Sequence, residues 1–321
     1  MDWIKVKIYT TSAGIEGVTG RLYQLGITGL EIDDEADFKD FLENNKQYWD
    51  YVDEELMKQK QGETKVVCYV SDDLNGNELL MSIRTSMAEM KSIDAENEYG
   101  RLEVELENTT TEDWANNWKK YFHPMEVGKR ILIKPEWEEL SEPTDRLVFN
   151  INPGMSFGTG SHNTTQLCIE ALEEYVKPGV KMLDLGCGSG ILSILSLMLG
   201  AEKAVAVDID PNAVDTAYEN AAMNDIDKSK YTVLSGNVVT DAEVQSIIGA
   251  DEYEVVAANI VADVIIALAP AAKRYMKEGG VFITSGIIEG RQDEVKAALE
   301  ENGFDIQEVR NSGDWYSIIC K

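Results

Sequence analysis

One segment in the second half of the chain has the pattern of a strand, a glycine turn and a helix. An expected strand at Val180–Leu183 leads into the seven residues DLGCGSG, numbered 184–190, and an apolar helix is expected from Ile191. Glycine adopts positive φ freely and has no Cβ, so such a turn can bend sharply and lie against a ligand. The glycines expected to contact that ligand are Gly186, Gly188 and Gly190. The pattern predicts an α/β fold that binds a ligand where the strand ends.

The chain after Asn163 alternates helices and strands with short links marked by glycine. This alternation is typical of a parallel sheet covered by helices on both faces, so we predict a doubly wound, Rossmann-like sheet. Its strands are expected near 181–185, 203–208, 231–235, 254–259, 279–285, 304–309 and 315–320. The last two are too close together for a crossover helix, so they should pair as an antiparallel hairpin at one edge.

Residues 1–110 predict a smaller first domain. Its expected elements are a strand at 3–10, a helix at 13–25, strands at 27–33 and 66–70, a helix at 77–90 and a strand at 102–106. Two successive βαβ units predict an α+β sandwich of the ferredoxin-like type, interrupted by an acidic and aromatic insertion at 35–61. A connecting helix or linker is expected at 111–128. Residues 129–321 then form the second domain, which begins with short strands at 130–135 and 146–151.

An acidic residue ends the strand that follows the glycine turn. Asp208 comes about 20 residues after the turn, the distance at which nucleotide-binding α/β folds place a carboxylate on the ribose hydroxyls. Asp210 is expected to cap the helix that begins at Pro211. The dinucleotide pattern GxGxxG is absent, because the third glycine comes one residue early. Asp184 would oppose a phosphate but could attract the amino group of a methionine moiety.

Two asparagines follow later strands of the predicted sheet. Asn237 could meet an adenine amino group, although an asparagine after Gly236 could equally stabilise the turn. Asn259 ends the fourth strand, which should lie beside the first at the ligand-binding edge of the sheet. Its amide could hold the methionine end of a cofactor, an incoming amine, or both, since an amide donates and accepts. The alternative is that Asn259 caps the helix expected from Ala262.

A segment rich in glycine, serine and threonine precedes the sheet. It covers residues 152–165, and we expect it to close over the site, with Thr164 and Thr165 at the start of a helix. The alternative is a long loop whose threonines only cap that helix. His162 is one of only two histidines and is expected to pack or cap rather than act as a base.

These residues together resemble a known family. DLGCGSG at 184–190 with Asp208 is similar to the class I S-adenosylmethionine methyltransferases. PGMSFGTGSHNTT at 153–165, the segment Asp113–Phe122 and the tetrad Asn259–Ala262 resemble the ribosomal protein L11 methyltransferases. The resemblance implies that Thr165, Gly186, Asp208 and Asn259 line the S-adenosylmethionine site.

The same resemblance implies a reaction and a division of labour between the domains. The substrate would be a basic large-subunit ribosomal protein, methylated on lysine side chains and the N-terminal amine. Residues 1–110 would recognise that protein and residues 129–321 would bind the cofactor. We expect a neutral amine to attack the methyl group directly, with no metal and with Asn259 as the catalytic residue. No nucleic-acid or membrane binding is expected.

Composition and motifs disfavour nucleic-acid binding, secretion and membrane insertion. The chain has 58 acidic and 29 basic residues, a net charge of −29 that would repel a phosphate backbone and suits a basic partner, or merely keeps the protein in solution. Its four scattered cysteines favour a reducing cytoplasm, and neither a signal peptide nor a membrane span is expected. The alternatives are a methyltransferase acting on RNA or another protein, a nicotinamide-dependent oxidoreductase and a catalytically silent binding module. The tetrad Asn259–Ala262 lacks the prolines and aromatic ring typical of enzymes that methylate bases.

Overall fold

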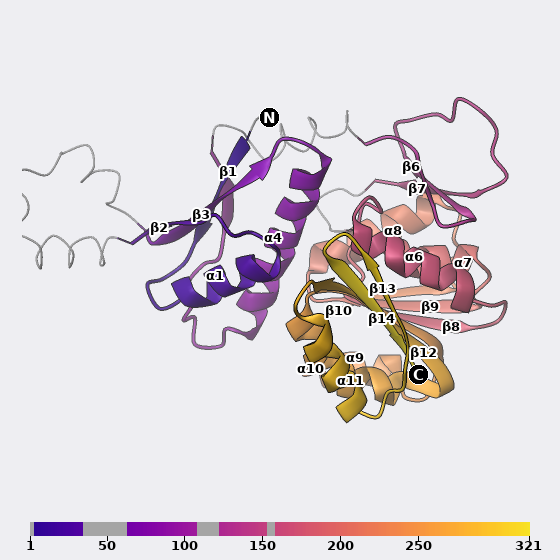
Figure 1. Ribbon diagram of the computed structural model, residues 1–321. Coiled ribbons are helices and arrows are strands. Elements are labelled where there is room, and N and C mark those ends of the chain that lie inside the picture. The colour runs from indigo at the N-terminus through magenta and orange to yellow at the C-terminus, as the bar shows by residue number, and fades with distance from the viewer. Residues whose placement is uncertain (1–2, 35–62, 108–121, 153–157) are drawn as a thin grey trace, which may run out of the picture. The chain divides into compact units, whose positions relative to one another are not determined.

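The structure is a computed structural model that describes residues 3–34, 63–107, 122–152 and 158–321 (Figure 1). The expected insertion at 35–61, most of the expected connecting helix and the start of the segment 152–165 lie outside the described residues. The chain divides into two compact units, Met1–Lys119 and Lys120–Lys321, and this division falls inside the predicted linker.

The N-terminal unit contains one antiparallel sheet in the order β2-β3-β1-β4, with α1 and α4 over one face (Figure 1). Its elements are β1 (Trp3–Tyr9), α1 (Ile15–Gln24), β2 (Glu31–Asp33), β3 (Lys65–Ser71), α4 (Leu74–Ile93) and β4 (Val104–Leu106). In β1, Ile4, Val6 and Ile8 are buried and alternate with more exposed residues, as expected for a strand with one covered face. The element order and sheet order confirm the predicted ferredoxin-like fold.

The C-terminal unit contains a seven-stranded sheet in the order β10-β9-β8-β11-β12-β14-β13. Its strands are β8 (Lys181–Leu185), β9 (Lys203–Asp208), β10 (Tyr231–Ser235), β11 (Tyr253–Asn259), β12 (Met276–Ile288), β13 (Ile306–Ser312) and β14 (Trp315–Cys320). The five strands from β10 to β12 are parallel, and β14 is antiparallel to both of its neighbours. The doubly wound sheet is confirmed, as is the antiparallel hairpin of the last two strands.

Helices cover both faces of this sheet. Figure 1 shows α6, α7 and α8 on one face and α9, α10 and α11 on the other. They are α6 (Asn163–Tyr175), α7 (Ile191–Met198), α8 (Pro211–Met223), α9 (Ala242–Ile248), α10 (Ala262–Tyr275) and α11 (Gln292–Glu301). None of the helices in the described part of the chain combines the length and apolar character needed to cross a bilayer.

A small second sheet precedes α6. It consists of β5 (Met125–Val127), β6 (Ile131–Pro135) and β7 (Leu147–Ile151), of which β5 was not predicted. β5 and β6 are antiparallel, whereas β6 and β7 run parallel, so the chain between them crosses over rather than forming a simple hairpin.

The sheet order locates the site. β8 is flanked by β9 on one side and β11 on the other, although β11 comes much later in the sequence. The chain therefore leaves the central strand in opposite directions, and ligands of open α/β sheets bind at the carboxyl edge beside such a reversal. The glycine turn, Asp208 and Asn259 all lie at this edge, because they end or follow β8, β9 and β11.

Candidate functional site

The glycine turn after β8 has a backbone that only glycine adopts easily. Gly186, Gly188 and Gly190 have φ values of +78°, +51° and +78°. A Cβ on Gly186 would lie 2.6 Å from Cγ2 of Ile260, and one on Gly190 would lie 2.7 Å from the hydroxyl oxygen of Tyr231. The turn therefore packs directly against the chain that follows β11, which joins the two predicted parts of the site.

Asp208 lies beside this turn. Its Oδ2 accepts a hydrogen bond from the backbone N–H of Gly188 at 2.8 Å, and its Oδ1 accepts one from Asp210 at 3.0 Å. The side chain is buried, and this burial raises the pKa of the carboxyl, against which the backbone N–H groups act. Asp210 instead caps α8 by accepting from the N–H of Asn212, as predicted. A carboxylate with further acceptor sites thus faces the glycine turn.

Asn259 supplies an unsatisfied acceptor. Its Nδ2 donates to Oγ1 of the fully buried Thr165 at 3.2 Å, so the two predicted residues meet. Its Oδ1 is buried and has no hydrogen-bond partner among the described residues. The alternative role as a helix cap is wrong, because α10 has Val261 at its N-cap and no side-chain cap bond. A buried polar atom without a partner is costly and rare, and Oδ1 is therefore available to accept a hydrogen bond from a ligand.

Asp184 is a second unsatisfied acceptor, one strand away. Its Oδ2 accepts from the backbone N–H of Ser193 at 3.0 Å, while its buried Oδ1 has no partner in the described part of the chain. Asp184 in β8 pairs with Ala257 in the neighbouring strand β11. Ala257 is two residues before Asn259, so Asp184 and Asn259 lie near the same edge of the sheet. Complete burial raises the pKa of Asp184 to about 7. The edge therefore holds two oxygen atoms that can receive the N–H donors of a cationic amine.

The described part of the segment 152–165 contacts the same turn. The hydroxyl of Ser189 donates to the carbonyl oxygen of Gly158 at 2.6 Å. His162 caps α6, with its Nδ1 3.3 Å from the backbone nitrogen of Thr164, and its ring meets Trp315 edge-on at 4.9 Å between centroids. Burial lowers the pKa of His162 to about 4, so the ring is neutral near pH 7. These contacts agree with a capping and packing role for His162.

Asn237 has a turn-forming role in the structure. Its Oδ1 accepts from the backbone N–H of Val239 at 2.9 Å, and its carbonyl oxygen accepts from Asp241 at 2.8 Å. The turn-stabilising alternative is therefore present, and a contact with adenine stays a prediction. Asn237 follows β10, which lies next to β9 and its terminal Asp208.

Two residues that contact predicted members of the site were not themselves predicted from the sequence. Ser193 holds Asp184 through its backbone, and Trp315 packs on His162 from the hairpin between β13 and β14. Ser193 lies in the first turn of the apolar helix α7, where a polar residue could have been recognised as a partner for the carboxylate at the end of the preceding strand. Trp315 gave no such signal, since it is far from His162 in the sequence.

The chain is similar to known proteins of one family. A family model described as ribosomal protein L11 methyltransferase (PrmA) matches residues 2–321. Proteins named ribosomal protein L11 methyltransferase are 37% identical over 319 residues in Clostridium perfringens and 38% identical over 335 residues in Lachnoclostridium phytofermentans. These matches cover 99% and 100% of this chain and 98% and 99% of the relatives. The crystal structure of a ribosomal protein L11 methylase from Lactobacillus delbrueckii subsp. bulgaricus aligns with a TM-score of 0.56 and 29% identity. That alignment covers 63% of this chain and 98% of the other.

Proposed function

Because the chain belongs to the ribosomal protein L11 methyltransferase family, we propose that it methylates lysine side chains and the N-terminal amine of ribosomal protein L11. It is a methyltransferase that uses S-adenosylmethionine. The observation that carries the proposal is a pair of buried acceptors that have no partner among the described residues, Oδ1 of Asn259 and Oδ1 of Asp184, beside a glycine turn and the carboxylate of Asp208.

The described residues fit an adenosyl group joined to an amino acid. Asp208 would accept hydrogen bonds from the two ribose hydroxyls, and the turn at Gly186, Gly188 and Gly190 would lie with its backbone against the ligand because glycine adopts the positive φ values that the bend needs. Asp184 would attract the cationic amino group of the methionine moiety, with Thr165 and Asn259 closing the same end. Asn237 would meet the adenine.

Methyl transfer needs an amine with a free electron pair. When bound, S-adenosylmethionine supplies an electrophilic methyl group, whose bond electrons stay with the departing sulfur. Lysine has a pKa of about 10.4 in water, so the protein must favour the neutral amine, and desolvation at a buried edge lowers an amine pKa. Oδ1 of Asn259 can accept an N–H from that amine and turn its electron pair towards the methyl group. Alignment of the reactants would then provide most of the acceleration.

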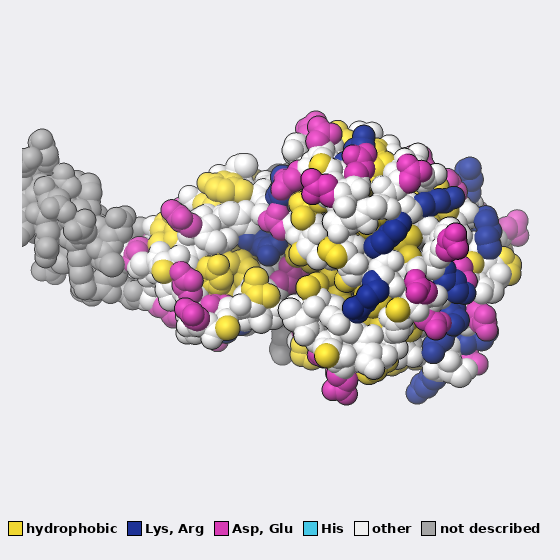
Figure 2. Space-filling view, turned by 90° about the horizontal axis from the view of Figure 1, so that it is seen from below, with side chains coloured by type: hydrophobic (Ala, Val, Ile, Leu, Met, Phe, Trp, Pro, Cys, Tyr) yellow, Lys and Arg dark blue, Asp and Glu magenta, His cyan; other side chains and the backbone are white. Residues whose placement is uncertain are grey.

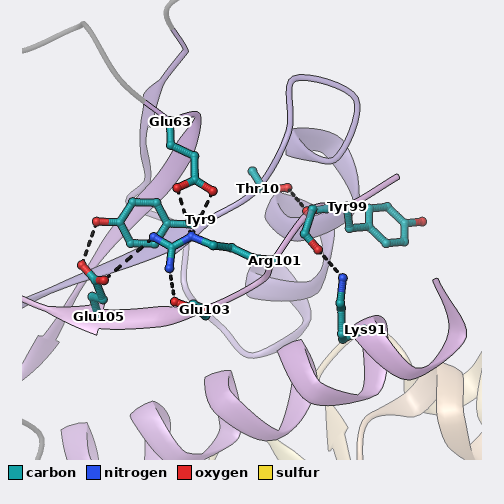
Figure 3. A network of polar contacts seen from close by, with 9 residues as sticks. Tyr9, Thr10, Glu63, Lys91, Tyr99, Arg101, Glu103 and Glu105 are labelled. Atoms are coloured by element: carbon teal, nitrogen blue, oxygen red, sulfur yellow. Dashed lines mark hydrogen bonds and ion pairs between the residues drawn. The ribbon is translucent and has the colours of Figure 1, made fainter. Parts of the chain in front are cut away.

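We assign recognition of the protein substrate to the N-terminal unit. The sheet face opposite α1 and α4 carries a network in which the Arg101 guanidinium lies 3.7 Å from the ring centre of Tyr9 (Figure 3). Arg101 pairs with Glu63 at 3.0 Å and also with Glu103, while the hydroxyl of Tyr9 donates to Glu105 at 2.7 Å. Three carboxylates, those of Glu63, Glu103 and Glu105, thus surround the Arg101 guanidinium.

The carboxylates on this face are more exposed than the cations they contact. Glu31 is 54% exposed and its partner Lys5 32%, and Glu105 is 54% exposed and its partner Arg101 32%. Glu107 is 36% exposed and its partner Lys7 24%. The acidic groups are thus the more exposed members of these pairs, and Trp3, on the same strand as Lys5 and Lys7, is 61% exposed. An acidic surface with an exposed aromatic residue suits a basic protein.

The charges disfavour RNA as the substrate, and the cysteines favour a reducing compartment. Figure 2 shows one face on which basic side chains of the C-terminal unit stand among acidic ones, and the whole chain has a net charge of −29. The residues after Asn259 are Ile260, Val261 and Ala262, so no aromatic ring follows it to stack on a base. All four cysteines are free and buried, which supports our placement of the reaction in the cytoplasm.

The test is methyl transfer from labelled S-adenosylmethionine to purified L11 and, separately, to ribosomal RNA. We expect label in L11 alone, and digestion with mass spectrometry should place it on lysines and the N-terminal residue. The Asn259→Ala variant, tested at equal concentration, controls for a contaminating activity. Label in RNA, or none in L11 although the cofactor binds, would overturn the assigned substrate.

A further inference from the structure

Helix α8 reaches the glycine turn through a single buried amide. Asn220 is fully buried, and its Nδ2 donates to the carbonyl oxygen of Ser189, inside the turn, at 2.9 Å. Its Oδ1 accepts from the backbone N–H of Asn152, just after β7, at 2.9 Å. One side chain thus joins two stretches of backbone that are distant in the sequence.

Ser189 also makes a second connection. Its hydroxyl donates to the carbonyl oxygen of Gly158, whose φ is +100° and where a Cβ would lie 2.8 Å from that hydroxyl oxygen. Asn152 and Gly158 are therefore both tied to the same residue of the turn, one through Asn220 and one directly. The chain continues from Gly158 into α6, which carries Thr165.

Helix α8 packs closely against the glycine turn. Its buried face consists of Ala213, Ala217 and Ala221 with Asn220 as the polar member. A Cβ on Gly190 would lie 2.9 Å from Cβ of Ala217, so the helix sits directly on the turn. The small side chains bring the backbone close enough for one amide to span the gap, whereas an apolar residue at 220 would leave a buried donor and a buried acceptor unpaired.

We propose that Asn220 is a positioning residue for the cofactor site. Acting through Ser189, it sets the position of the glycine turn relative to the end of β7 and to the loop that leads to Thr165. The glycine turn, which would contact the adenosyl group, and Thr165, which would contact the methionine end, are then kept at a fixed separation. The proposal rests on the assigned methyl donor, but not on the identity of the methylated protein.

The chain contains a matched control one helical turn away. Oδ1 of Asn224 accepts from the N–H of Asn150 at 2.8 Å, and its Nδ2 donates to the carbonyl oxygens of Asn150 and Asn220 at 2.7 and 2.8 Å. Asn224 thus ties the same helix to the same strand with at least as many hydrogen bonds. It forms no hydrogen bond with the turn among the described contacts, so it separates general anchoring of α8 from positioning of the turn.

The experiment compares Asn220→Ala, Asn224→Ala and Ser189→Ala in the full chain. Calorimetry with S-adenosylhomocysteine gives Kd, initial rates give kcat and both KM values, and thermal melts give Tm. We expect Asn220→Ala to raise Kd and the KM for S-adenosylmethionine about tenfold, the effect of about one hydrogen bond, while the KM for L11 changes less than about twofold. Asn224→Ala should lower Tm to a similar extent and leave Kd within about twofold of the wild type.

Two further variants sharpen the result. Asn220→Asp keeps the acceptor for the N–H of Asn152 but directs an oxygen at the carbonyl of Ser189, so it should bind the cofactor no better than Asn220→Ala. In the double variant with Ser189→Ala the losses should be less than additive, because both act on the same turn. Equal Kd changes in Asn220→Ala and Asn224→Ala, or an unchanged Kd in Asn220→Ala, would overturn the proposal. A wild type that binds the probe but leaves L11 unmodified would overturn only the assigned substrate.

Discussion

Replacing Asp184 by asparagine should make the cofactor-free protein more stable at alkaline pH and less able to bind its cofactor. Asp184 is fully buried, and burial raises the pKa of its carboxyl from 3.8 to about 7. Its Oδ1 has no partner among the described residues, so nothing in that part of the chain compensates the charge there. Asparagine has nearly the same shape and is neutral at every pH.

The sign follows from the direction of the pKa shift. In the unfolded chain Asp184 ionises near its usual pKa of 3.8, whereas in the folded protein it keeps its proton until about pH 7. The contribution of this residue to the free energy of unfolding is therefore greatest below pH 4, and it decreases as the pH rises from about 4 to about 7. The shift of about three pKa units corresponds to roughly 4 kcal/mol. Asparagine does not ionise, so its contribution to the free energy of unfolding does not fall with pH. It does bury an unpaired NH₂ group, which costs about 1–3 kcal/mol.

Thermal melts without cofactor at about pH 5 and about pH 8 measure the effect. Between these values the stability of Asp184→Asn relative to the wild type should rise by roughly 3 kcal/mol. For a unit of this size that is a change of about 6–12 °C in the difference between the two Tm values. The affinity of the wild type for S-adenosylhomocysteine should also increase as the pH passes about 7, and that of the variant should not. A Tm difference independent of pH would refute the reasoning.

Three simpler variants test the other contacts. Asn259→Ala should lower kcat about 10- to 100-fold in the L11 assay and lower Tm only by the loss of the one hydrogen bond from Nδ2 to Thr165, because Oδ1 has no partner in the described structure; an unchanged kcat would remove it from the site. Asp208→Asn should weaken S-adenosylhomocysteine binding about 10- to 100-fold by calorimetry through loss of charge-assisted hydrogen bonds, and unaltered affinity would contradict the ribose assignment. Glu173 accepts from the N–H groups of Lys129 and Arg130 at 2.8 and 2.6 Å, so Glu173→Ala should cost about 1–3 kcal/mol in urea melts. Its kcat should stay as in the wild type, and equal loss of both would count against a purely structural role.

The sequence predicted features that depend on neighbouring residues. The strands at 181–185, 203–208, 231–235 and 315–320 match the structure residue for residue, because short apolar runs between glycine links have few other ways to fold. The ends of β12 and β13 were predicted less well. β12 includes an irregular start at Met276, and β13 begins two residues later than expected, where periodicity is weak.

Contacts between distant segments were harder to predict. The pairing of β6 and β7 in parallel depends on where their partners lie, and the two short runs themselves are equally suited to a hairpin. Within the site, Thr165 and Asn259 were both expected, but only the fold shows that Asn259 donates to Thr165 and that its Oδ1 has no partner in the described part of the chain.

Asn220 shows most clearly why a sequence alone misses such residues. In a helix with alanines at its buried positions, an asparagine looks like an ordinary polar position, and its helical spacing predicts only that it is buried. Its role arises because β7 and the glycine turn approach the same point of α8, which no local pattern encodes. Both polar atoms of Asn220 bond to backbone groups outside α8, so its identity depends on the two segments that it joins and not on the helix that carries it. The cost of replacing it should therefore appear in cofactor affinity, where the position of the turn matters, and not only in stability.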